Sequence, residues 1–211
     1  MRPTFASLII ATTALMASTV QAQTVLLNDT FDTENGGLGA GVYSGFANFT
    51  VADVDLLGPS YFSHLCQAAG GGTPCVDMEG NGNGVMTTRS AYALAPGQVT
   101  VQFDLAGDQR GGTSNAVTAS LVNTLGESIF SEKFSLASDA PFSTFTRTIV
   151  LTTATTASLR FLSSGPADSF GMLLDNVSLS VTAVPESPSG VLIATGLSLV
   201  ALVTRRRRVK A

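Results

Sequence analysis

The stretch that decides the fold is Val99-Thr100-Val101-Gln102-Phe103-Asp104-Leu105. Apolar side chains stand at every second position, and polar side chains stand between them. Successive side chains of a β-strand point to opposite faces of its sheet. This alternation therefore predicts a half-buried strand, with one face on a core and the other toward water.

Similar segments recur along the middle of the chain, where turn formers interrupt the sequence at roughly the 8–12-residue spacing typical of all-β domains. We expect strands over 25–31, 46–56, 85–89, 117–122, 129–136, 144–151, 158–162 and 172–181 as well. No segment of this region has a helical apolar period. The pattern predicts an all-β fold, an antiparallel two-sheet sandwich of jelly-roll type, over residues 23–183.

Residues 1–22 are typical of a secretion signal peptide. Arg2 precedes the apolar run 6–17, and small residues stand three positions and one position before a cleavage point between Ala22 and Gln23. We expect signal peptidase to cut there. The alternative, an N-terminal membrane anchor, is disfavoured because the run is shorter than the ~20 residues that a spanning helix needs.

Residues 184–211 have the order of a membrane-sorting segment. Val184, Pro185 and Glu186 precede the apolar stretch 190–203, which ends before four arginines, Arg205, Arg206, Arg207 and Arg208. A helix over 187–204 would be about 27 Å long, close to the ~30 Å hydrocarbon core of a bilayer. The arginines favour a cytoplasmic C-terminus, which would leave the domain outside. A buried core helix is the alternative.

This arrangement resembles the PEP-CTERM sorting signal of Gram-negative bacteria, although Ser187 stands at the position of the second motif proline. The resemblance implies processing by an exosortase. It also implies that the protein is exported, anchored transiently in the inner membrane, and then moved to the cell surface or extracellular matrix. Proteins with this signal accompany exopolysaccharide and biofilm formation, so exopolysaccharide is an expected partner.

Charge limits the partners of the middle region. Between Gln23 and Ala183 there are 14 acidic and five basic side chains, a net charge of −9. Binding to nucleic acid needs clustered Lys and Arg, so we expect no nucleic-acid partner. Cations remain compatible with this charge.

The chain has two cysteines, Cys66 and Cys75. An exported protein meets an oxidising compartment, so we expect a disulfide between them. Zinc binding is the alternative, although a lone cysteine pair is a weak zinc signature. The single histidine, His64, is interpreted as a loop residue.

Several short motifs resemble exported carbohydrate-binding jelly rolls. They are Phe31-Asp32, Val54-Asp55-Leu56 with Gly58, the segment 76–80, the segment 103–111, and the closing segment 174–179. The resemblance implies a sandwich whose members include both sugar binders and inert modules. Sugar binding usually needs exposed aromatic rings, and the candidates are Tyr43 and Tyr61 in Gly-rich loops.

Asp175 shares parity with the apolar residues of the last predicted strand, so its carboxylate needs a partner. Jelly rolls of the resembling kind often join the final strand to the loop after the first strand through calcium. Here that implies a structural calcium site with Asp32 and Asp175 as main ligands and Asp29 or Glu34 assisting. A buried ion pair with Arg147, or a bulge that turns Asp175 toward water, are the alternatives.

No nucleophile and base stand in a recognisable catalytic motif. Asp53 with Asp55 and Asp77 with Glu79 are carboxylate pairs, but residues at i and i+2 share a strand face in any case. The segment 77–82 is interpreted as a hairpin turn. We therefore predict a non-catalytic, exported surface or matrix module, with a lectin-like carbohydrate-binding module as the alternative and a glycan hydrolase as the second alternative.

Overall fold

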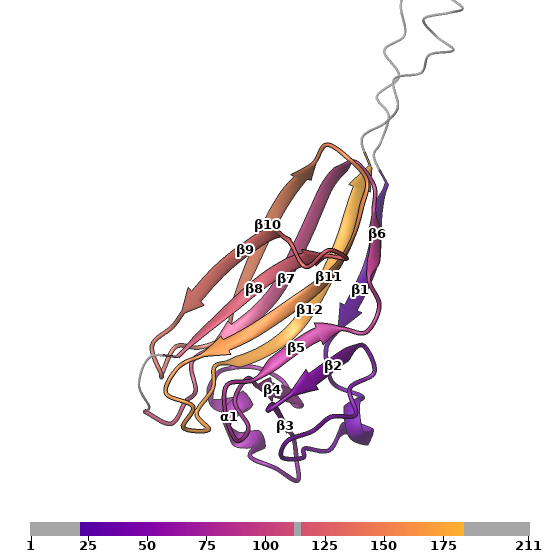
Figure 1. Cartoon of the computed structure of the whole chain (residues 1–211). Helices are drawn as coiled ribbons and strands as arrows, with labels where there is room; N and C mark the ends of the chain where they lie inside the picture. Colours follow the sequence, from indigo (N-terminus) through magenta and orange to yellow (C-terminus); the bar gives the residue numbers. More distant parts are fainter. Residues whose placement is uncertain (1–21, 112–114, 184–211) are drawn as a thin grey trace, which may run out of the picture. The chain divides into compact units, whose positions relative to one another are not determined.

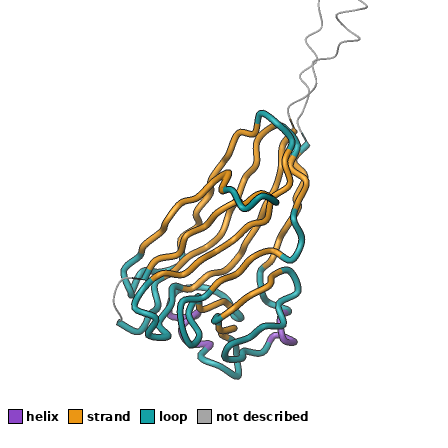
Figure 2. The backbone as a smooth tube through the Cα atoms, in the orientation of Figure 1, coloured by secondary structure: helices purple, strands orange, loops and turns teal. Residues whose placement is uncertain are grey.

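The computed structural model describes residues 22–111 and 115–183, which form two stacked antiparallel sheets (Figures 1 and 2). In chain order the elements are β1 (Gln23–Asp29), a 3-10 turn η1 (Glu34–Gly37), β2 (Phe49–Ala52), β3 (Asp55–Leu57), α1 (Ser63–Ala68), β4 (Cys75–Asp77), β5 (Val85–Thr88), β6 (Tyr92–Leu94), β7 (Gly97–Ala106), β8 (Ala116–Asn123), β9 (Ser128–Ser135), β10 (Ser143–Leu151), β11 (Thr155–Ser164) and β12 (Leu173–Ala183).

The first sheet has the order β10-β7-β12-β4-β3, and β1 pairs with the C-terminal half of β12. The second sheet has the order β2-β5-β11-β8-β9, with β6 pairing the start of β11. Each sheet has six strands. The predicted all-β, two-sheet antiparallel sandwich is confirmed.

The strand pairs are nested. β8 pairs with β9, β7 with β10, β6 with β11 and β1 with β12. The chain therefore forms one long hairpin whose paired strands are distributed over both sheets. This is the topology of a jelly roll.

The core lies between the sheets, and β7 contributes alternate side chains to it, as its sequence predicts. Phe103 of β7 is fully buried and meets Phe134 of β9 and Phe161 of β11 edge-to-face, each at 5.2 Å between ring centroids. Such pairs add to the burial of apolar area, which is the main stabilising contribution. The two sheets are thus joined by aromatic contacts at their middle.

A second, smaller cluster covers the outer face of the first sheet at one end. Its buried members come from α1, β3, β4, β7 and β12, and are Leu57, Leu65, Cys66, Ala69, Cys75, Ala106 and Leu173. Because the core covers the other face, β3 and β4 are buried on both sides. Strands of that kind lose the apolar/polar alternation. This is why the sequence pattern did not predict β4.

Other sequence expectations are corrected. The strand expected over 46–56 is two strands, because Asp53 takes a left-handed φ of 51° and the chain changes sheets from β2 to β3. The hairpin turn predicted over 77–82 does form, closed by the antiparallel bridge between Glu79 and Asn83, but the strands on either side of it, β4 and β5, lie in opposite sheets. His64 lies in α1, a helix that the sequence did not predict, and not in a loop.

The disulfide between Cys66 and Cys75 is confirmed, with 6.0 Å between the Cα atoms. It fastens α1 to β4. No zinc site therefore forms at these two sulfur atoms.

The predicted cleavage point precedes Gln23, which is the first residue of β1. Residues 1–21 of the predicted signal peptide lie outside the described residues. So do the sorting residues Val184, Pro185, Glu186 and Arg205 to Arg208. Within residues 22–111 and 115–183, no helix is long and apolar enough to cross a membrane. The predicted span over 190–203 lies outside those ranges.

Candidate functional site

Figure 1 shows α1, β3 and β4 together at one end of the sandwich. A pocket of about 250 Å³ is lined by β3 and by loops near this end. It is formed by loops that are distant in the sequence. Its lining residues are Val42, Asp55, Tyr61, Phe62, Gly80, Asn81, Arg110, Ser169 and Phe170.

Aromatic rings supply the apolar part of this pocket. Tyr61 and Phe62 meet edge-to-face with their ring centroids 4.7 Å apart. Phe62 is 53% exposed, and Phe170, from the loop before β12, is 37% exposed. Exposed rings that are held in place by a fold are ready contact surfaces for a ligand with an apolar face.

Asp55, at the start of β3, is the carboxylate of the pocket. Its Oδ1 accepts a hydrogen bond from the Val42 amide at 2.6 Å, and its Oδ2 accepts one from the Tyr61 hydroxyl at 3.3 Å. Burial and the Asp55 carboxylate raise the pKa of Tyr61, so the hydroxyl stays a donor. A Cβ at Gly80 would lie 3.0 Å from Asp55 Oδ1, so a larger residue there would crowd the carboxylate.

Arg110 is held by a buried ion pair. Its Nη2 lies 2.5 Å from Oδ2 of Asp77, a fully buried side chain on β4. The guanidinium carbon also stands 4.6 Å from the centroid of the Phe170 ring, a cation–π geometry. Burial raises the pKa of Asp77 to about 7, against the lowering effect of Arg110.

The backbone of the pocket is strained at three points. Val42, Phe62 and Ser169 have left-handed φ values of 43°, 49° and 67°. A β-branched or bulky residue rarely takes this conformation. Such strain clusters at ligand sites, where surrounding contacts hold a geometry that local preference disfavours.

The carboxylate pair Asp77 and Glu79 lies behind the pocket, not in it. Both side chains are fully buried. Glu79 Oε1 accepts a hydrogen bond from the Ser163 hydroxyl at 3.0 Å, and burial raises the pKa of Glu79. Within the described part of the chain, Glu79 Oε2 and Asn115 Oδ1 have no hydrogen-bond partner. Neither Asp77 nor Glu79 can touch a glycan from this position.

The predicted calcium ligands lie elsewhere, around the end of β1. Asp175 on β12 is buried, and burial, Asp32, Asp104 and Asp29 together raise its pKa to about 7. The structure thus brings Asp175 close enough to Asp32 and Asp29 for their charges to interact. Glu34 is used differently, because its carboxylate accepts hydrogen bonds from the Ala47 amide at 2.7 Å and the Tyr43 hydroxyl at 3.5 Å.

Among residues 22–111 and 115–183, no group of three or more His, Cys, Asp and Glu side chains has the arrangement of a metal site. Asp29 is hydrogen-bonded to the Phe31 amide at 3.0 Å and to the Asn48 amide group at 3.1 Å. Calcium at this position therefore remains a prediction.

Both alternatives to calcium can be checked against the contacts. Arg147 pairs with Glu132 at 2.6 Å and does not reach Asp175. The pairing of β12 with β7 does shift between Asp175 and Ser178, and Asn176 has a left-handed φ of 51°. Asp175 nonetheless stays 5% exposed, so the bulge does not turn it to water.

The two candidate sugar-binding tyrosines separate in the structure. Tyr61 lines the pocket. Tyr43 packs edge-to-face on Phe46, 4.9 Å between centroids, and does not line it. Phe62, Phe170 and Arg110 were not predicted as site residues. The available signal was an aromatic residue inside a loop rich in turn formers, as in Ser169-Phe170-Gly171.

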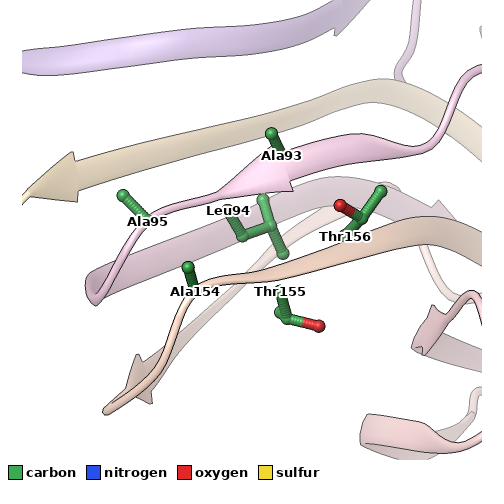
Figure 3. Close-up of a pocket in the computed structure, with 6 residues that line it drawn as sticks. All are labelled: Ala93, Leu94, Ala95, Ala154, Thr155 and Thr156. Carbon is green, nitrogen blue, oxygen red and sulfur yellow. The ribbon is translucent and has the colours of Figure 1, made fainter.

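A second pocket, of about 390 Å³, lies beside β6 and the start of β11 (Figure 3). Its lining consists of Ala93, Leu94, Ala95, Ala154, Thr155 and Thr156. These side chains offer methyl groups and two hydroxyls, and no charged or aromatic group among them. The pocket at the α1 end is therefore the better candidate for recognition.

Comparison with known proteins finds similar solved structures. The sequence matches no protein-family model and no curated protein. Similar solved structures include the K3 cleaved adhesin domain of Lys-gingipain from Porphyromonas gingivalis, with a TM-score of 0.46, 19% identity, and coverage of 74% of this chain and 98% of that chain.

Carbohydrate-binding modules also appear among the similar structures. The CBM22-1 xylan-binding domain of Xyn10C from Paenibacillus barcinonensis has a TM-score of 0.44, 12% identity, and coverage of 79% of this chain and 99% of that chain. The C-terminal CBM6 of the marine laminarinase LamC from Zobellia galactanivorans has a TM-score of 0.42 at 16% identity and covers 63% and 92% of the two chains. At these TM-scores, below 0.5, the fold assignment rests on the strand pairing of this chain itself.

Proposed function

We propose that the domain is a carbohydrate-binding module and that the pocket beside α1 receives a sugar unit. The observation that carries this proposal is that Tyr61, Phe62 and Phe170 line the same pocket as the Asp55 carboxylate. A sugar ring has an apolar C–H face and an edge of hydroxyl groups. Exposed aromatic rings suit the first, and a carboxylate that accepts hydrogen bonds suits the second.

The size and rigidity of the pocket support the same proposal. Its volume of about 250 Å³ is below the roughly 300–1,000 Å³ typical of sites for larger small molecules. One sugar unit of a longer chain fits this scale better than a bulky cofactor does. The strained loops are held by tertiary contacts, so little ordering is needed on binding.

We propose further that the module is not a hydrolase. A glycosidase places two carboxyl groups on either side of the bond it cleaves. Of the described residues that line the pocket, Asp55 alone carries a carboxylate. Asp77 and Glu79 are fully buried behind it, which supports binding without cleavage.

Binding of the purified full chain to a glycan array tests the proposal. Phe62→Ala and Phe170→Ala should each weaken binding by about tenfold or more, equivalent to about 1.4 kcal/mol. Leu125→Ala is the matched control, because Leu125 is an 82% exposed apolar residue in the β8–β9 turn. Binding that survives both phenylalanine variants, or release of free sugar, would contradict the proposal.

The setting we propose for this module is the cell surface or extracellular matrix, with exopolysaccharide as partner. Export through signal peptidase, transient inner-membrane anchoring, and sorting by an exosortase follow from the sequence signals at residues 1–22 and 184–211. A glycan-binding pocket agrees with a matrix role, since it would attach the protein to secreted polysaccharide.

We also propose a structural calcium ion between the end of β1 and β12, with Asp32 and Asp175 as main ligands. The buried Asp175 carboxylate and its proximity to Asp29 and Asp32 support this site. Hard oxygen ligands of this kind suit calcium. Glu34 is the weakest of the expected ligands, because the Ala47 amide and Tyr43 already occupy its carboxylate.

A further inference from the structure

The pocket contains one charged side chain that is ion-paired and one that is not. Of the described lining residues, Asp55 and Arg110 are the charged ones. They do not neutralise each other. Within the described ranges two ion pairs form, Arg110 with Asp77 and Arg147 with Glu132, so Asp55 has no cationic partner there.

The positive charge of Arg110 is already matched. Asp77 contacts its Nη2 at 2.5 Å from a fully buried position, where the charges interact more strongly than they would in water. The guanidinium face also lies on the Phe170 ring. An incoming anion would therefore meet a guanidinium whose charge Asp77 already matches, although its Nε has no hydrogen-bond partner among the described residues.

Among the described residues, the hydrogen bonds that Asp55 accepts come from neutral donors. These are the Val42 amide and the Tyr61 hydroxyl. A carboxylate has about four acceptor positions, so two hydrogen bonds leave capacity for sugar hydroxyls. Asp77 lies opposite Asp55 in the β3–β4 pairing, but its charge is paired with Arg110, so Asp55 carries the unmatched charge of the three.

From this charge arrangement we infer that the pocket selects uncharged sugars and disfavours uronates and other acidic sugars. The inference rests on the proposed glycan-binding function and gives its ligand class. An uncharged sugar donates hydroxyl groups to Asp55, whereas a uronate brings a second carboxylate next to an unmatched one. Like charges in one site disfavour binding.

The test uses pairs of polysaccharides that are matched in sugar and glycosidic linkage and differ in oxidation at C6: glucan with the glucuronan of the same linkage, and mannan with the mannuronan of the same linkage. Affinities of the full chain are measured at pH 8, above the pKa of about 7 of Asp77. We expect the neutral member of the bound pair to bind at least about tenfold more tightly than its uronate counterpart.

Two variants examine the cause of this selectivity. Asp55→Asn should narrow the neutral-to-uronate ratio, because it removes the unmatched charge. Asp77→Asn should raise uronate affinity, because it frees Arg110 for the uronate carboxylate. Glu127→Gln in the β8–β9 turn is the matched control and should leave the ratio unchanged. If Asp77→Asn fails to fold, lowering the pH from 8 to 6 on the wild-type chain protonates Asp77 and should raise uronate affinity likewise.

The outcomes separate the two proposals. A uronate that binds as tightly as its neutral counterpart, with binding lost in Phe62→Ala, would overturn the selectivity and leave the glycan-binding function standing. Binding to no member of any pair and to no array glycan would overturn both.

Discussion

The buried acidic side chains Asp77 and Asp175 lie in two different environments. Asp77 has a cationic partner in Arg110, at 2.5 Å. Asp175 receives one hydrogen bond, from the Asn176 amide at 2.7 Å, and is surrounded by other acids. A buried carboxylate without a positive partner favours its neutral form or a bound cation. Asp175 is therefore the residue at which stability should respond to both protons and calcium.

The pH dependence of Asp175 has a defined sign. Its pKa is raised from 3.8 to about 7 in the folded domain, so the folded state holds the proton more tightly. In EDTA, the free energy of unfolding should fall as the pH rises from about 4 to about 7 and then level off. Asp77 titrates in the same window. One proton that only the folded state holds gives the free energy of unfolding a slope of up to about 1.4 kcal/mol per pH unit. Asp175→Asn should remove this contribution to the slope.

Calcium should reverse this behaviour above pH 7. If calcium binds only the folded domain, an excess of 100 times its Kd would add about 2.7 kcal/mol to the free energy of unfolding. Thermal unfolding with EDTA and with excess calcium measures this. An unchanged midpoint in the wild-type chain would reject the site, and a shift that persists in Asp175→Asn would place the ion elsewhere.

At the scale of elements, the short helix α1 explains several features together. It covers the outer face of β3 and β4, and the disulfide joins it to β4. Tyr61 and Phe62 immediately precede it and line the pocket. The disulfide therefore supports both the second apolar cluster and one wall of the proposed glycan site.

Removing the disulfide should affect stability and binding together. For Cys66→Ser with Cys75→Ser we expect the free energy of unfolding to fall by about 2 to 3 kcal/mol, since the loop it closes is short. Glycan affinity should fall as well, because Tyr61 and Phe62 lose their fixed support. Urea denaturation and array binding measure the two effects. Full binding in the double variant would show that α1 positions these rings without the bond.

On the scale of the whole domain, β1 begins and β12 ends at the opposite end of the sandwich from α1 and β3 (Figure 1). β12 runs from Leu173, beside the pocket loops, to Ala183, and its 11 residues span roughly 35 Å. Gln23 pairs with Thr182, so the two ends of the domain stand together. The ends of the domain are therefore separated from the pocket loops by the length of β12.

The proposed export can be tested on the mature protein. Mass spectrometry of material recovered outside the cell should find an N-terminus at Gln23 and no tryptic peptide from the apolar stretch 190–203. The expectation follows from the predicted signal-peptidase and exosortase cuts. Recovery of an intact C-terminus in that material would contradict the sorting prediction, although an N-terminus at Gln23 would still support export.

The sequence by itself determined what depends on local periodicity. The alternation from Val99 to Leu105 specified β7 because side-chain direction in a strand repeats every two residues. Asp175 alternates along β12 with the apolar residues Leu173 and Val177, and this spacing predicted that its side chain is buried. The lone cysteine pair, taken with the predicted export signal, predicted the disulfide. Each of these needed only neighbouring residues or composition.

Tertiary structure decided where the strands divide and which side chains meet. The sequence did not show that Asp53 would send β2 and β3 to opposite sheets, because a left-handed φ at a non-glycine residue depends on surrounding contacts. Nor did it bring Asp55, Arg110 and Phe170 together, since they are 55 and 60 residues apart along the chain. Only the wrapping of the jelly roll joins their loops into one pocket, and long-range pairing of this kind leaves no local pattern to read.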